Sequence, residues 1–164
     1  MIRGQRVREE RDAIAAVHDS LGHSPPILVW YAPRVAAASP FDPLGGADRV
    51  RALVERFYDH MSVHEPVLAR LHPVDAAGSV ARPNRDRFAL FLIGWLGGPD
   101  TYVEQHGHPR LRMRHARVLV DEAMRDAWLR SMTFAMNAEQ ITGPVRAFLD
   151  GRFAEVADFL RNGP

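Results

Sequence analysis

The sequence predicts an all-α protein. Apolar residues recur at helical spacing over long segments, and the main part of the chain lacks the alternating pattern of a half-buried strand. Glycine and proline stand where such helices would begin or end, as in "GGP" at 97–99. We expect a helical domain over residues 41–164, preceded by an extension over residues 1–40 that is partly helical or disordered.

Length and composition fit a single globular domain. The 164 residues are 46% apolar and 25% charged, close to globular averages. A net charge of +1 gives the molecule no overall electrostatic attraction to nucleic acid or to an anionic membrane. The absence of cysteine excludes disulfides, iron–sulfur clusters and thiolate zinc. The longest apolar run, 88–96, is too short to span a bilayer, and we expect a cytoplasmic protein.

The extension differs in composition from the rest of the chain. Residues 3–20 are compatible with a mostly polar helix. The stretch "HSPPILVWYAPR" surrounds one short apolar run with prolines, which favours an extended segment.

Two helices are expected first, with a short one between them. From Gly46 an apolar stripe comprises Val50, Leu53, Val54, Phe57, Tyr58 and Met61, so the Tyr58 phenol should point inward. "EPVLARLHP" predicts a short helix that ends near Pro73. A second stripe, ended by "GGP", comprises Phe88, Phe91, Leu92 and Trp95.

Three more helices are predicted after a loop. "HPRLRMRH" predicts a short helix that opens at Pro109. Asp121 begins the next, whose inner face comprises Met124, Trp128, Ser131, Met132 and Ala135. The last opens at Pro144 and is expected to bury Val145, Phe148, Leu149, Phe153, Val156 and Leu160.

The segment "YVEQHGHPRLRMRHARVLV" concentrates histidine and arginine and admits three interpretations. His106, His108 and His115 could supply nitrogen ligands to zinc, but the helix expected at Pro109 separates them and no HExxH motif is present. Nucleic acid is a weaker candidate because the domain is nearly neutral. Arginines would also suit a small dianion such as haem with its two propionates.

A haem site requires an imidazole for the iron, an apolar slot and polar groups on the opposite face. His115 offers the imidazole, and Tyr58 and Trp128 place hydrogen-bond donors on apolar helix faces. Either aromatic residue alone is more often a core residue bonded to a carbonyl. Their occurrence together with His115 favours haem.

The segments "FDPLGG", "RFYD", "LHP", "GWLGGP", "YVEQHGHPRLRMRH" and "RDAWL" resemble the group II truncated haemoglobins in order and spacing. The resemblance covers residues 41–162. It implies a shortened globin with two helices packed over two others around haem b, and a protein that binds O2, NO and CO.

The resemblance also implies roles for particular residues. His115 corresponds to the proximal iron ligand, Tyr58 and Trp128 to distal donors, and His72 and Asn84 to further distal positions. The other residues implied to contact haem, the last three of them near its propionates, are Phe88, Arg87, Tyr102 and Arg112.

Three features depart from the family pattern, and one of them is that residues 1–40 lie outside it. "RHARV" replaces the usual "RHAPF", so the chain leaving His115 is expected to run differently. The stretch "DAAGSVARPN" carries Pro83, which leaves the start of the distal helix undecided.

The resemblance favours a protein that holds O2 for chemistry or sensing, with oxygen transport as a further candidate and nitric oxide oxidation or peroxide reduction as candidate activities. Electrons would come from a separate reductase, and a monomer or homodimer is expected. The alternatives are a haem-less globin-fold interaction or sensor module and a zinc hydrolase using His106, His108 and His115.

Overall fold

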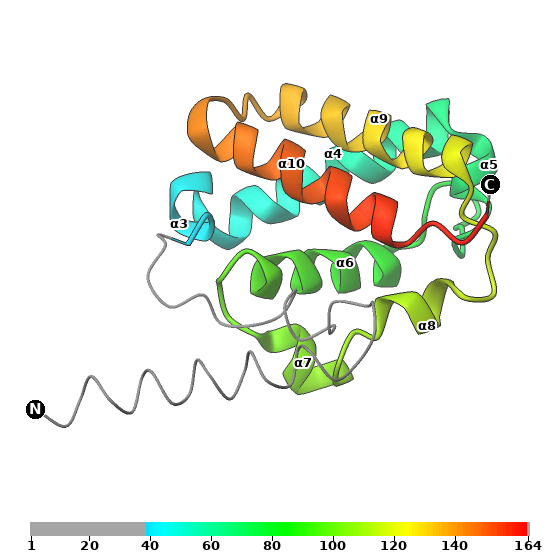
Figure 1. Ribbon diagram of the computed structural model, residues 1–164, viewed down its shortest axis with the longest axis horizontal. Coiled ribbons are helices and arrows are strands. Elements are labelled where there is room, and N and C mark those ends of the chain that lie inside the picture. The colour runs from blue at the N-terminus through cyan, green and yellow to red at the C-terminus, as the bar shows by residue number, and fades with distance from the viewer. Residues whose placement is uncertain (1–38, 164) are drawn as a thin grey trace, which may run out of the picture. The chain divides into compact units, whose positions relative to one another are not determined.

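The computed structural model describes residues 39–163, which fold mainly into helices (Figure 1). These residues contain no strand, and only an isolated antiparallel bridge joins Val74 to Val80. The prediction of an all-α domain is confirmed. The polar helix and the extended segment expected at the N-terminus lie outside the described residues.

The helices of the described region follow one another in the order α3 (Phe41–Leu44), α4 (Gly46–His64), α5 (Pro66–Ala69), α6 (Arg82–Trp95), α7 (Thr101–His106), α8 (Leu111–His115), α9 (Glu122–Ala138) and α10 (Gly143–Phe159).

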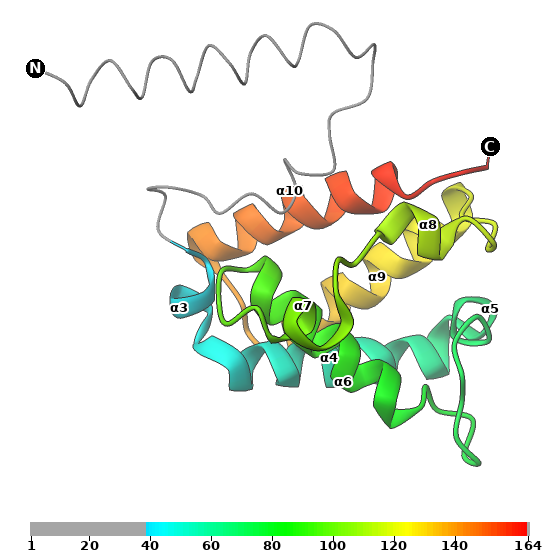
Figure 2. The same cartoon turned by 90° about the horizontal axis from the view of Figure 1, so that it is seen from below.

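The four longest helices form two packed pairs. α4 contacts α6 in one pair, α9 contacts α10 in the other, and α4 also packs against α9 (Figure 2). The predicted stripe of α4 is wholly buried at this junction, from Val50 to Met61. Burial of that stripe removes its apolar surface from water and so stabilises the fold. The short helix α7 packs against α6, and both α7 and α8 lie below α6 in Figure 1.

Local sequence signals account for where the long helices begin. Asp121 precedes α9 and accepts a hydrogen bond from the Met124 N–H at 2.9 Å, as an N-cap residue does. Pro144 lies in the first turn of α10, as predicted. Pro83 lies in the first turn of α6, where a missing N–H leaves no helical bond unmade. The distal helix therefore begins at Arg82.

The short helices differ from the predictions. α5 ends at Ala69, before Pro73, and α8 begins at Leu111 because Arg110 has a left-handed φ of 45°. α7 forms where a loop was expected, and α3 was not predicted. Helices of this length have too few residues to show a periodic apolar pattern in the sequence. They are stabilised by tertiary contacts. None of the helices in the described region is long and apolar enough to cross a membrane.

Candidate functional site

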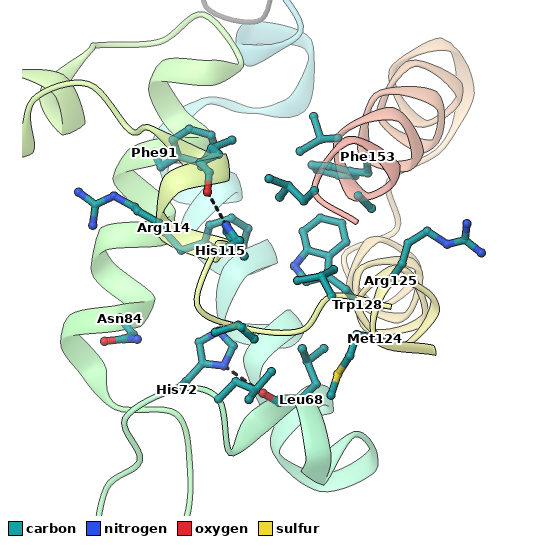
Figure 3. A pocket seen from close by; sticks show the side chains of 18 of the residues that line it. Leu68, His72, Asn84, Phe91, Arg114, His115, Met124, Arg125, Trp128 and Phe153 are labelled. Carbon is teal, nitrogen blue, oxygen red and sulfur yellow. Dashed lines mark hydrogen bonds between the residues drawn. The ribbon is translucent and has the colours of Figure 1, made fainter. Parts of the chain in front are cut away.

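A cavity of about 400 Å³ is lined mainly by α6, α8, α9 and α10 (Figure 3). Its volume falls within the roughly 300–1,000 Å³ typical of sites for small molecules and cofactors. The apolar lining residues are Leu68, Leu71, Phe88, Phe91, Leu92, Trp95, Leu111, Val118, Leu119, Val120, Met124, Phe153, Val156, Ala157 and Leu160. The lining residues with polar groups are Tyr58, His72, Asn84, Arg87, Tyr102, Arg114, His115, Arg125 and Trp128.

The cavity brings together every residue that the resemblance implied for the haem site except Arg112. The Arg112 guanidinium lies 5.1 Å from the centre of the Phe159 ring and is not part of the lining. Its contact with a propionate remains a prediction.

His115 ends α8, and its two ring nitrogens have different surroundings. Nδ1 lies 2.8 Å from the carbonyl oxygen of Leu111, one turn earlier. Because a carbonyl oxygen only accepts, Nδ1 carries the proton and Nε2 keeps its lone pair. A backbone carbonyl that orients one ring nitrogen in this way is usual for histidines that bind metal through the other. The ring lies at the cavity (Figure 3), so His115 is suited to bind a metal there.

The turn that follows His115 is held by the C-terminal segment. Nδ2 of Asn162 donates to the carbonyl oxygens of His115 at 3.2 Å and Val118 at 2.9 Å. Oδ1 of the same side chain accepts from the Val120 N–H at 2.8 Å. The departure from the family pattern at Arg117 lies within this turn. Asn162 therefore fixes the course of the chain at the position where the sequence departs from the family pattern.

Tyr58 brings a hydroxyl to the cavity from α4. Its ring is buried and packs edge-on against Phe57 and Phe88, with centroids 4.9 and 5.8 Å away. Burial raises the pKa of Tyr58 well above its ordinary value, and the nearby Arg85 guanidinium offsets this only in part. No described residue forms a hydrogen bond with the hydroxyl. The phenol stays protonated and is available as a donor.

Trp128 brings a second donor from α9. Its indole packs against Phe57 and Phe153, with centroids 5.3 and 5.6 Å away. Figure 3 shows the indole in the cavity with its nitrogen on the cavity side. The indole N–H can only donate, and no described residue accepts from it. Both residues line the cavity, so their donors are available to a polar ligand there.

His72 adds a neutral imidazole on the same side as Tyr58, with ring centroids 5.6 Å apart. Burial lowers the pKa of His72, and hydrogen bonds to the Leu68 and Ala69 backbone oppose this only partly. Nδ1 lies 3.2 Å from the Leu68 carbonyl oxygen and therefore carries the proton (Figure 3). Nε2 is left as an acceptor.

Two lining arginines, Arg114 and Arg125, were not identified from the sequence. Arg125 is held by the carboxylates of Glu122, Asp126 and Asp158, and Figure 3 shows both guanidinium groups directed away from the cavity. Their aliphatic stems therefore form the lining. The position of Arg114 next to His115 in the sequence could have indicated that it lines the cavity. No sequence feature indicated this for Arg125.

The three histidines of the zinc hypothesis do not assemble. No group of three or more histidine, aspartate or glutamate side chains in residues 39–163 is placed to hold a metal ion. The His106 ring packs edge-on against Tyr102 at 5.2 Å, and His108 Nδ1 accepts from the Arg110 N–H at 3.1 Å. The described part of the chain offers the zinc hydrolase hypothesis no site.

The residues of the cavity fit haem. The walls are largely apolar, as a porphyrin requires, and His115 would hold the iron through Nε2. Arg87 lines the cavity from an exposed position and forms no ion pair with a described residue, which leaves it free to meet a propionate. The unsatisfied donors of Tyr58 and Trp128 come from other helices than His115.

Comparison with known proteins identifies relatives that match about three quarters of this chain and most of their own length. A model of the family described as bacterial-like globin matches residues 39–161. The group 2 truncated hemoglobin YjbI of Bacillus subtilis is 34% identical over 124 residues, which are 76% of this chain and 89% of the relative.

Solved structures agree with this result. The group II truncated hemoglobin of Bacillus anthracis superimposes with a TM-score of 0.70 at 34% identity, covering 78% of this chain and 99% of its own. A truncated oxygen-avid haemoglobin from Bacillus subtilis gives a TM-score of 0.68 at 34% identity, covering 76% and 99%. The structural neighbours share this arrangement of packed helix pairs. The predicted two-over-two globin fold is therefore confirmed.

Proposed function

Since the chain belongs to the bacterial-like globin family, we propose that it is a haem b protein that binds O2 and other small diatomic ligands. The observation that carries the proposal is the His115 imidazole, whose Nδ1 is bonded to Leu111 and whose Nε2 is free at an apolar cavity. Bound haem would supply an iron atom that binds the ligand.

The side chains of the protein have different roles at that site. His115 holds the iron, the apolar walls exclude water, and Arg87 meets a propionate. Trp128 and Tyr58 donate hydrogen bonds toward a ligand that gains negative charge on binding. The neutral His72 presents Nε2 as an acceptor beside the Tyr58 ring.

Hydrogen bonds from the two donors, Trp128 and Tyr58, would hold bound O2 firmly. Firm binding favours a chemical reaction of O2 over its delivery to another site. We assign the protein to O2-dependent reactions such as nitric oxide oxidation, with electrons from a separate protein. The relative described as oxygen-avid supports this choice. Aerobic consumption of nitric oxide by the reduced protein tests it, and a rate no faster than that of free haem would contradict it.

The haem assignment is tested by replacing His115 with alanine. We expect loss of the haem absorption band near ~400 nm, or a weakly held haem that added imidazole restores, because His115 is the axial ligand. His106→Ala and His108→Ala serve as matched controls and should keep the native spectrum. A native spectrum in His115→Ala would overturn the assignment. A protein that stays colourless after haem addition would instead indicate a haem-less module.

A further inference from the structure

Four arginines around His115 differ from most other arginines of the described region. No described carboxylate forms an ion pair with any of them, and they are Arg110, Arg112, Arg114 and Arg117. The arginines that do form ion pairs are Arg49, Arg56, Arg82, Arg85, Arg125, Arg130, Arg146, Arg152 and Arg161. These four side chains, none of them paired with a described carboxylate, cluster around α8, and we name them the α8 arginine surface.

All four members of this surface are exposed, and α8 lies at the edge of the described domain (Figures 1 and 2). The nearest following carboxylate, Asp121, already caps α9 through the Met124 N–H. Arg114 also lines the cavity next to His115. The surface therefore adjoins the site proposed for haem.

Exposed apolar side chains lie among these arginines. Met113 is 67% exposed and Leu119 is 61% exposed. Arginine and methionine are enriched in protein–protein interfaces, whereas a nucleic-acid site relies on phosphate contacts over a broad basic face. Basic and apolar groups together favour a protein partner with an acidic surface.

We propose that the α8 arginine surface docks an acidic protein that donates single electrons to the haem iron. In this step one electron leaves the reduced centre of the donor and converts ferric iron to ferrous iron, and no covalent bond forms or breaks. The inference rests on the proposed function, because it requires haem in the cavity. It gives the O2-dependent chemistry its electron source at a defined place.

The charge of the surface suits such a partner. Electron-transfer encounters are weak and occupy small interfaces, often below about 1,200 Å². Positive charge attracts an acidic partner over long distances and raises the association rate by roughly 10- to 1,000-fold at low ionic strength. Docking beside His115 also shortens the path from the donor to the iron.

The experiment uses the full-length haem protein and a plant-type [2Fe–2S] ferredoxin as an acidic one-electron donor. Arg110→Gln/Arg117→Gln removes two charges that line no part of the cavity. Arg51→Gln/Arg70→Gln is the matched control, since these exposed arginines of the described region also form no ion pair with a described carboxylate. Stopped-flow absorption follows reduction of ferric haem, and calorimetry measures ferredoxin binding at several salt concentrations.

We expect the first variant to be reduced by ferredoxin about tenfold more slowly at low salt, with weaker binding, and the control to behave as the native protein. High salt should remove the difference, and reduction by dithionite should be equal in all three. Equal ferredoxin rates and affinities in both variants would overturn the docking surface. If a DNA duplex displaced ferredoxin at a concentration below that of ferredoxin itself, the proposal would be overturned in favour of a nucleic-acid partner. Absence of a haem spectrum would instead overturn the proposed function.

Discussion

At the scale of single residues, we expect Trp128 to set how long a ligand stays bound. Its N–H lies in the cavity without an acceptor among the described residues. A hydrogen bond to a charged partner contributes about 1.5–3 kcal/mol, and each 1.4 kcal/mol corresponds to a factor of about ten. Trp128→Phe should therefore speed O2 dissociation about ten- to a hundredfold, with a smaller effect on CO.

Stopped-flow ligand replacement measures these rates. Tyr58→Phe should change O2 dissociation in the same direction, although the Tyr58 hydroxyl shares its surroundings with His72. An unchanged O2 dissociation rate in Trp128→Phe would show that the indole is a core side chain only.

Arg85 is a residue that matters for stability. Its guanidinium is buried between α4 and α6 and bonds to Glu55 at 2.9 Å, Asp59 at 2.7 Å and the Val80 carbonyl oxygen at 2.9 Å. The carboxylates are partly exposed and can be rehydrated, so the loss is smaller than for a fully buried pair. Arg85→Met should lower the free energy of unfolding by about 2 kcal/mol.

Chemical denaturation followed by circular dichroism tests this value. Arg82→Met is the control, because Arg82 bonds to the same Glu55 from an exposed position and should cost less than about 1 kcal/mol. Equal losses in the two variants would contradict the importance of burial at Arg85.

At the scale of elements, α8 and the turn after it depend on the C-terminal segment. The Asn162 side chain makes three hydrogen bonds to the backbone between His115 and Val120. Each contributes about 0.5–1.5 kcal/mol, and this site is exposed. Asn162→Ala should loosen His115 and speed haem release about tenfold.

Haem transfer to an excess of apomyoglobin measures that rate. Asn137→Ala is a suitable control, since Asn137 bonds to Arg146 and lies outside the cavity lining. A release rate unchanged by Asn162→Ala would mean that α8 holds His115 without the C-terminal segment.

The lengths of the helices explain why sequence patterns predicted some of them and missed others. α4, α9 and α10 each bury a stripe over several turns, so helical spacing identified them. α3, α7 and α8 have four to six residues and depend on contacts with longer helices. Their limits follow from local conformations, such as the left-handed Arg110, that composition does not reveal.

At the scale of the whole molecule, the residues expected to meet haem lie within residues 39–163, and all of them but Arg112 line the cavity. The Ser39 hydroxyl donates to the Leu96 carbonyl oxygen at 2.7 Å, so a truncation should stop before Ser39. Deleting residues 1–38 should leave a folded domain that binds haem, since the family match begins at residue 39.

Absorption spectra and thermal unfolding of the truncated protein test this expectation. Insolubility, or failure to take up haem, would place the apolar run at 27–31 in the core of the domain. The extension would then be structural.

The sequence alone determined the helical class of the domain, the long helices and the residues expected at the haem. Helical periodicity places Tyr58 and Trp128 on inward faces because a helix repeats every 3.6 residues. The spacing of the motifs around His115 identified the family. These are local or pattern properties that a linear sequence carries.

Only the tertiary structure decided which side chains meet across the cavity. It separated Arg112 from the lining, brought in the stems of Arg114 and Arg125, and kept His106 and His108 from joining His115 in a metal site. It also placed Asn162 against the turn after His115, more than forty residues away in the chain. Such contacts arise from the packing of helices that are distant in sequence, and no local pattern records them.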